Sequence, residues 1–181
     1  MKSFLLFVWE VAKIVIIALV IVVPIRYFLF QPFFVKGQSM EPNFENGDYL
    51  IVDEISYRFH DPQRGDVVVF KYPYNSSQRY IKRIIGLPGE TVEIKDGKVI
   101  IINDKENQVL DESKYLSSSV QTFGNGDFVI NPGEYFVLGD NRSVSADSRS
   151  WGLLPRYDMV GKVFLRAWPL TTFKEIKTPA Y

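Results

Sequence analysis

The chain has 181 residues, enough for one domain with or without an added anchor segment. Its 21 lysine and arginine residues balance 21 aspartate and glutamate residues, and this neutral charge argues against a nucleic-acid binder. The chain has no cysteine and a single histidine, His60, which excludes disulfide scaffolds, cysteine nucleophiles, thiolate zinc sites and two-histidine metalloprotease motifs. We therefore expect any acid–base catalysis to use mainly lysine, carboxylate, tyrosine or arginine side chains.

Residues 4–30 form an apolar segment whose only charges are Glu10, Lys13 and Arg26. A helix of this length spans roughly 40 Å, which exceeds the hydrocarbon core of a bilayer, about 30 Å thick. We therefore expect residues 1–30 to form an uncleaved transmembrane anchor with a short cytoplasmic end. A cleaved secretory signal peptide is one alternative, but small residues at a suitable cleavage site are lacking. A buried helix of a soluble domain is the other.

From residue 31 onward, short β-prone runs alternate with glycine, proline, asparagine and aspartate. Asp96 and Gly97 stand between two such runs and predict a two-residue hairpin. Many short strands separated by turns favour a mainly β fold, an antiparallel sandwich or barrel-like domain over residues 31–181. The polar stretch 103–126 is expected to be an inserted loop or small lobe at the periphery. The runs that predict strands are 49–55, 66–72, 79–85, 90–94, 98–102, 127–130, 134–138 and 160–167.

Three segments carry side chains suited to catalysis. Ser39 lies in a glycine-containing loop, 35–44, where a serine taken alone most often makes turn hydrogen bonds. Lys82 lies in segment 79–90, on the strand face that also carries aromatic and apolar side chains. Burial there would lower its pKa, whereas the alternative is an edge-strand lysine that prevents aggregation. In segment 133–152 a strand leads into a loop dense in polar groups, either a solvated turn network or the rigid support of a site.

These segments, in this order behind an apolar N-terminus, resemble the bacterial type I signal peptidases. The matching motifs are GQSMEP at 37–42, RGDVVVFKYP at 64–73, YIKRIIGLPGE at 80–90 and GDNRSVSADSRSWG at 139–152. The resemblance implies a membrane-bound serine endopeptidase that removes N-terminal signal peptides from exported preproteins. It further implies a single-pass protein of the plasma membrane with its catalytic domain on the extracytoplasmic side. No metal and no organic cofactor are implied.

The resemblance assigns the chemistry to a serine and a lysine. It implies that Ser39 is the nucleophile, that Lys82 is its general base, and that the backbone N–H of Ser39 contributes to the oxyanion hole. A serine hydroxyl needs a base to remove its proton, and a lysine can do this only where its surroundings disfavour the ammonium form. The position of an additional oxyanion-hole serine found in some family members is Gly37 here.

Other residues match supporting positions of the family. Ser145 would hydrogen-bond and orient the lysine amine, and an ion-pair network would brace the site. The sequence also departs from the family, because Asn43 replaces the usual threonine, and Ser143 and Val144 replace a commoner Asp-Asn pair. The network residues implied by the resemblance are Asp147, Arg149, Asp140 and Arg83.

The substrate is expected to bind as an extended strand beside the apolar segment that precedes Ser39. In the family this is β-augmentation, with shallow pockets for small side chains at positions −1 and −3. Met40, Phe33 and Val35 are the implied contacts, and the same surface would rest against the lipid bilayer. Ordinary core packing is the alternative for each of these three side chains.

Two other functions are compatible with parts of this pattern. One is a LexA-like self-cleaving protein, which also uses serine and lysine on a β fold but is soluble and carries a DNA-binding unit. The other is a membrane-tethered β module that binds peptides without cleaving them. The apolar N-terminus argues against the first, and the presence of both Ser39 and Lys82 argues against the second.

Overall fold

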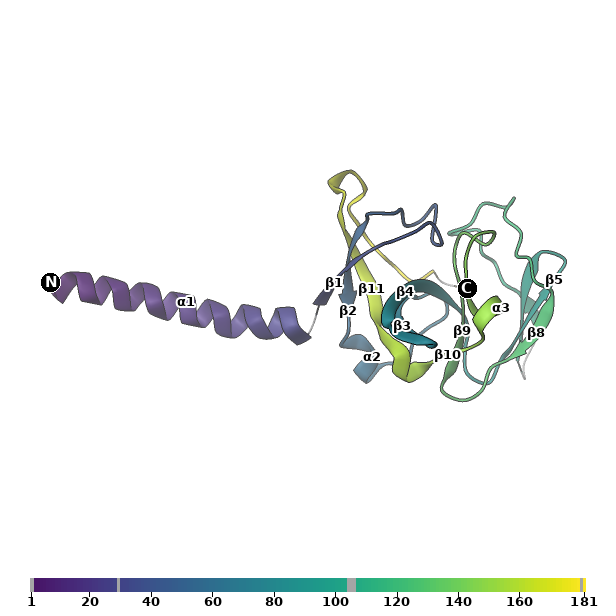
Figure 1. Cartoon of the computed structure of the whole chain (residues 1–181), viewed down its shortest axis with the longest axis horizontal. Coiled ribbons are helices and arrows are strands. Elements are labelled where there is room, and N and C mark those ends of the chain that lie inside the picture. Colours follow the sequence, from purple (N-terminus) through teal and green to yellow (C-terminus); the bar gives the residue numbers. More distant parts are fainter. Residues whose placement is uncertain (1, 29, 104–106, 180) are drawn as a thin grey trace.

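The computed structural model describes residues 2–28, 30–103, 107–179 and 181. A long helix, α1 (Lys2–Phe28), leads into a β-rich domain that contains the other described residues (Figure 1). Positions 1 and 29 of the expected N-terminal unit, positions 104–106 of the expected loop and position 180 lie outside the described residues.

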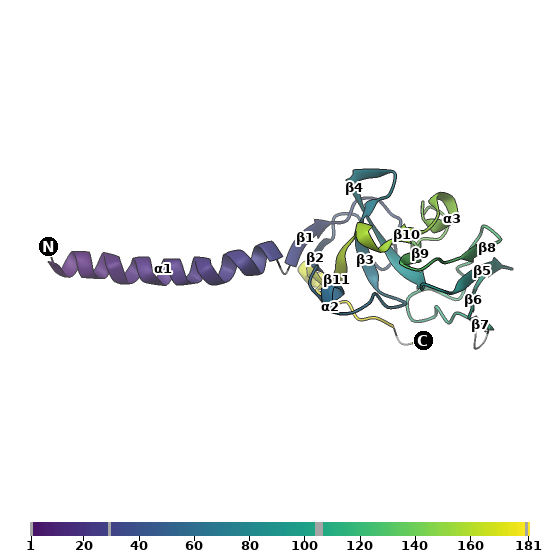
Figure 2. The same cartoon turned by 90° about the horizontal axis from the view of Figure 1, so that it is seen from below.

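Two antiparallel sheets make up the β domain. The smaller sheet lies at the end of the domain that is far from α1 (Figures 1 and 2). The larger sheet runs in the order β1-β2-β11-β3-β4-β9-β10, with β12 paired to β11, and the smaller one in the order β7-β6-β5-β8. The strands of the larger sheet are β1 (Phe30–Phe34), β2 (Tyr49–Asp53), β3 (Val67–Tyr72), β4 (Asn75–Gly86), β9 (Glu134–Leu138), β10 (Leu154–Pro155), β11 (Met159–Trp168) and β12 (Lys174–Glu175). Those of the smaller sheet are β5 (Thr91–Lys95), β6 (Lys98–Ile102), β7 (Asn107–Val109) and β8 (Gly126–Val129).

Short helical turns join some of the strands. They are α2 (Ser56–Phe59), α3 (Ser148–Trp151) and the 3₁₀ turns η1 (Arg156–Asp158) and η2 (Leu170–Thr172). The Asp147 side chain caps α3 by accepting a hydrogen bond from the Arg149 N–H. The capped helix α3 directly follows the loop after β9. Both the loop and the helix belong to segment 133–152, which the sequence singled out.

The mainly β, antiparallel character predicted from the sequence is confirmed. Each of the eight predicted runs lies on a strand, and the hairpin at Asp96 and Gly97 forms with positive φ angles of 51° and 77°, as a primed turn requires. The strands that the sequence did not predict are β1, β7, β10 and β12. Three of them, β7, β10 and β12, are short and each pairs with a longer neighbour, whereas β1 is as long as its partner β2 and lies at the end of the larger sheet.

The barrel-like alternative is wrong. Within the described residues, each sheet has two open ends, β1 and β10 in the larger and β7 and β8 in the smaller. A barrel requires the first and last strands of one sheet to pair. Instead, the chain crosses from β4 into β5 and returns from β8 to β9, so the domain is built from two open sheets.

The expected transmembrane anchor is not supported. The apolar segment does form a helix, α1, over nearly the whole of the predicted range. Among the helices of the described residues, however, none combines the length and the apolar character needed to cross a membrane.

The described part of the segment expected at the periphery, residues 103 and 107–126, contacts both sheets, since its Tyr115 ring lies 4.1 Å from Arg83 Cζ on β4. It contains β7 of the smaller sheet, and the side chains of Leu110, Leu116 and Thr122 are buried. Its Glu112 carboxylate forms an ion pair with Arg142 in the loop after β9. The segment therefore contacts a loop that carries candidate site residues.

Candidate active site

Lys82 lies near the centre of the larger sheet. Its strand, β4, pairs with β3 on one side, where Val68 faces Lys82, and with β9 on the other. The side chain is 3% exposed, although lysine is almost never buried without a partner. Strand alternation places the next residue, Arg83, on the opposite face of the sheet.

Ser39 lies in a tight turn between β1 and β2. The Glu41 N–H donates to the Gln38 carbonyl (3.2 Å), and the Phe44 N–H donates to the Met40 carbonyl (2.9 Å). The side chains of Met40 and Phe44 are 1% and 2% exposed and anchor the turn in the core. Because the turn is anchored in this way, the position of the half-buried Ser39 side chain is fixed.

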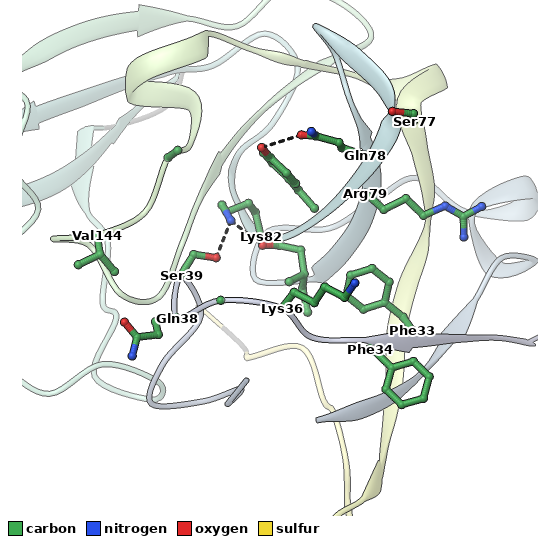
Figure 3. A pocket seen from close by; sticks show the side chains of 14 residues that line it. Phe33, Phe34, Lys36, Gln38, Ser39, Ser77, Gln78, Arg79, Lys82 and Val144 are labelled. Carbon is green, nitrogen blue, oxygen red and sulfur yellow. Dashed lines mark hydrogen bonds between the residues drawn. The ribbon is translucent and has the colours of Figure 1, made fainter. Parts of the chain in front are cut away.

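The two side chains point toward one another across the site (Figure 3). Lys82 Nζ lies 2.7 Å from Ser39 Oγ and also donates a hydrogen bond to the Ile81 carbonyl (2.9 Å). Burial lowers the pKa of Lys82 to about 8, against the opposing effect of the Asp147 and Asp140 carboxylates. An amine with this pKa is substantially neutral in mildly alkaline solution, which is the form that accepts a proton.

Two bidentate ion pairs lie near Ser39 and Lys82. Arg83 Nε and Nη2 donate to the two carboxylate oxygens of Asp140 at 2.8 and 2.6 Å. Arg149 Nε and Nη2 donate to the carboxylate of Asp147, both at 2.8 Å. The Asp147 carboxylate also accepts from the Gly139 N–H (3.1 Å), so it ties the start of the loop after β9 to α3. The bracing role expected of these four residues stays a prediction.

Gly139 allows this loop to approach the nucleophile turn. A β-carbon at Gly139 would overlap both Ser145 Oγ and the Ser39 carbonyl oxygen, so no larger residue fits. Ser145 Oγ itself is buried and has no hydrogen-bond partner among the described residues. The expected contact between Ser145 and the Lys82 amine is therefore absent in this arrangement, and the orienting role stays a prediction.

A cavity of about 720 Å³ opens at the dyad. In Figure 3 Phe33 and Phe34 lie on one side of Ser39, and Gln38 and Val144 lie on the other. Of the three expected substrate contacts, only Phe33 lines the cavity, whereas Met40 and Val35 are buried core side chains. The remaining lining residues are Lys36, Gly37, Ser39, Ser77, Gln78, Arg79, Tyr80, Ile81, Lys82 and Ala146.

Several lining residues were not predicted from the sequence. Tyr80 could have been found, because strand alternation places it on the face of Lys82, and its ring lies 5.5 Å from Nζ. Gln38 and Val144 carried no local signal, since their position depends on two loops that meet only in the fold. Within the described residues, no cluster of three or more histidine, aspartate or glutamate side chains could hold a metal ion.

Comparison with known proteins identifies the family. The family described as "Signal peptidase, peptidase S26" matches residues 8–168, most of the chain. The chain belongs to this family. Its members are serine peptidases, which hydrolyse peptide bonds, and the paired serine and lysine are consistent with that chemistry.

Signal peptidase relatives from different bacteria align over nearly the whole chain. "Probable signal peptidase I-1" of Synechocystis sp. is 35% identical over 94% of this chain and 87% of its own length. "Signal peptidase IB" of Staphylococcus aureus is 35% identical over 90% of this chain and 91% of its own length. A crystal structure of a signal peptidase I from Enterococcus faecalis is 34% identical, with a TM-score of 0.48, and covers 57% of this chain and 97% of that chain.

Proposed function

We propose that this signal peptidase family member cleaves N-terminal signal peptides from exported preproteins, with Ser39 as nucleophile and Lys82 as general base. The observation that carries the proposal is the 2.7 Å distance between Ser39 Oγ and the buried Lys82 Nζ, at the wall of a cavity large enough for several residues of a peptide. The names of the relatives, which are signal peptidases, support the choice of substrate.

The reaction needs one proton carrier and one nucleophile. The neutral Lys82 amine takes the hydroxyl proton as Ser39 Oγ attacks the scissile carbonyl carbon, and the backbone N–H of Ser39 stabilises the oxyanion. When the intermediate collapses, the Lys82 ammonium gives that proton to the leaving amine, and the signal peptide remains as an ester on Ser39. A water molecule, deprotonated by Lys82, then hydrolyses the ester and restores the hydroxyl.

The substrate is proposed to lie as an extended strand in the cavity, beside β1 and the residues that follow it. Such a strand gains affinity from backbone hydrogen bonds and selectivity from shallow pockets for alternate side chains. Phe33 lines the wall, whereas Met40 and Val35 support it from the core. Small side chains at positions −1 and −3 are the expected requirement.

The activity is expected to rise with pH through the pKa of Lys82. Only the neutral amine accepts the serine proton, and its fraction grows as the pH passes about 8. The quantity to measure is kcat/KM on a preprotein-derived peptide without ionisable groups near the scissile bond, and half of the maximal value is expected at about pH 8. A flat profile between about pH 6 and 10 would contradict a lysine base.

We further propose that α1 attaches the β domain to the lipid bilayer of the plasma membrane, with the domain on the extracytoplasmic side. Large apolar side chains are exposed on this helix, and such a surface is costly in water. They include Phe4, Leu6, Phe7, Trp9, Ile14, Ile16, Ile17, Leu19 and Val20.

Attachment can be measured by flotation with phosphatidylcholine liposomes. The full chain is expected to float, and the double variant Ile16→Glu/Val20→Glu is expected to remain largely in the soluble fraction, because it places charges in the apolar surface. The matched control, Val109→Glu/Val129→Glu, changes two exposed apolar side chains of the smaller sheet and is expected to float normally. Equal flotation of all three proteins would rule out attachment through α1.

A further inference from the structure

A closed ring of contacts lies behind the dyad, on the face of β4 opposite Lys82. The bidentate pair of Arg83 and Asp140 forms one side of the ring. The side-chain amide of Asn43 donates from Nδ2 to Asp140 Oδ2 (2.9 Å) and to the Tyr115 carbonyl (2.7 Å). The Tyr115 ring then lies 4.1 Å from Arg83 Cζ and closes the ring. The ring therefore joins four residues that are distant in sequence, Asn43, Arg83, Tyr115 and Asp140.

Ser39 and Asn43 belong to the same turn, and both attach to the loop after β9. The Ser39 carbonyl accepts a hydrogen bond from the Asn141 N–H (3.1 Å), and the Asn43 amide bonds the preceding residue of that loop. Asn43 lies inside the turn that the Phe44 N–H closes by donating to the Met40 carbonyl. The nucleophile turn is thus held at both ends against one loop.

We propose that Asn43 is a positioning residue that fixes the turn carrying Ser39 at hydrogen-bond distance from Lys82. Both N–H donors of its amide are engaged, so rotation of the side chain would break two hydrogen bonds. A threonine, which the family resemblance makes usual at this position, has a single hydroxyl donor and can satisfy only one of the two acceptors. The inference rests on the proposed function, because positioning matters only if the dyad is catalytic.

Asn43 also acts on the charge of Asp140. This carboxylate raises the pKa of Lys82 against the effect of burial, and a hydrogen bond to its Oδ2 offsets part of its charge. Without the hydrogen bond from Asn43, the negative charge of Asp140 would stabilise the Lys82 ammonium more strongly. Lys82 would then release its proton at a higher pH. The charged or aromatic groups around the amine include Asp140 and Asp147 of the loop after β9, Arg83 and Arg149 that pair with them, the Tyr80 ring, and Lys36 and Arg79 in the wall of the same cavity.

The test is the full pH profile of peptide cleavage by Asn43→Ala beside the wild-type chain. We expect kcat to fall by up to about 10²-fold, the loss that follows a displacement of reacting groups by about 1 Å, with KM unchanged and the midpoint of kcat/KM moved to higher pH. For Asn43→Thr, both kcat and the pH midpoint of kcat/KM should lie between the values of the wild-type chain and those of Asn43→Ala. Asn131→Ala is the matched control, since its amide also bonds a carboxylate, that of Glu134 (2.7 Å), but on an exposed turn.

An unchanged kcat and an unchanged midpoint in Asn43→Ala would overturn the positioning role, and so would a loss matched by Asn131→Ala. A loss confined to KM would also overturn it, because that result indicates substrate contact. If Asn43→Ala fails to fold, as thermal unfolding would reveal, Asn43→Thr carries the same test with the same expected direction. A wild-type chain whose activity does not titrate contradicts the lysine base and hence the proposed function, which is a separate result.

Discussion

Replacing Ser39 with alanine is expected to lower kcat on a signal-peptide substrate by about 10⁴-fold or more, the loss that follows removal of a nucleophile or its base. Lys82→Met should cost about as much, because the two groups act as a unit in one proton transfer. The substrate for the measurement is a preprotein with alanine at −1 and −3, incubated with the full chain in detergent.

The control for this pair of variants is Ser117→Ala. Ser117 is not among the residues that line the cavity, and its hydroxyl bonds that of Ser119 (3.0 Å) at an exposed position, so its loss should leave both the fold and the cleavage rate unchanged. Circular dichroism of each variant should match the wild-type chain. Normal cleavage by a folded Ser39→Ala or Lys82→Met protein would refute the dyad.

The largest effect on stability is expected from Asp140→Ala. Its carboxylate and the Arg83 guanidinium are 1% and 5% exposed and form a bidentate pair. Removing the acid leaves a buried guanidinium whose remaining hydrogen bond is to the Gly65 carbonyl (2.9 Å). Breaking a buried pair in this way is expected to lower the free energy of unfolding by about 3–5 kcal/mol.

An exposed ion pair of the same chain provides the comparison. Lys95 and Glu93 lie 3.9 Å apart with 63% and 26% of their side chains exposed. Lys95→Ala is therefore expected to change the free energy of unfolding by no more than about 1 kcal/mol. Urea unfolding of both variants measures the difference, and an Asp140→Ala protein as stable as Lys95→Ala would show that the buried pair contributes little.

Segment 103–126 makes contacts that its local composition does not reveal. Its polar residues predict a peripheral loop, yet Tyr115 contacts Arg83 through its ring and Asn43 through its carbonyl. Glu112 pairs with the buried Arg142 of the loop after β9. These partners are 30 or more residues away in sequence, so no local pattern could reveal them.

Met40 and Val35 illustrate the same limit for apolar residues. Their position next to the nucleophile motif favours substrate contact, whereas the structure packs both into the core below the cavity. A sequence motif fixes the neighbours along the chain but not the direction of each side chain. That direction depends on how the turn between β1 and β2 docks against the rest of the larger sheet.

The sequence by itself determined eight of the strands, the Asp96-Gly97 hairpin and the family, because alternation, turn residues and short motifs are local properties of the chain. Only the tertiary structure decided that two open sheets form instead of a barrel, and that Ser39 and Lys82, 43 residues apart, meet at 2.7 Å. Both outcomes depend on long-range strand pairing. The same pairing excludes water from the Lys82 amine and thereby lowers its pKa, which no property of the isolated segment could do.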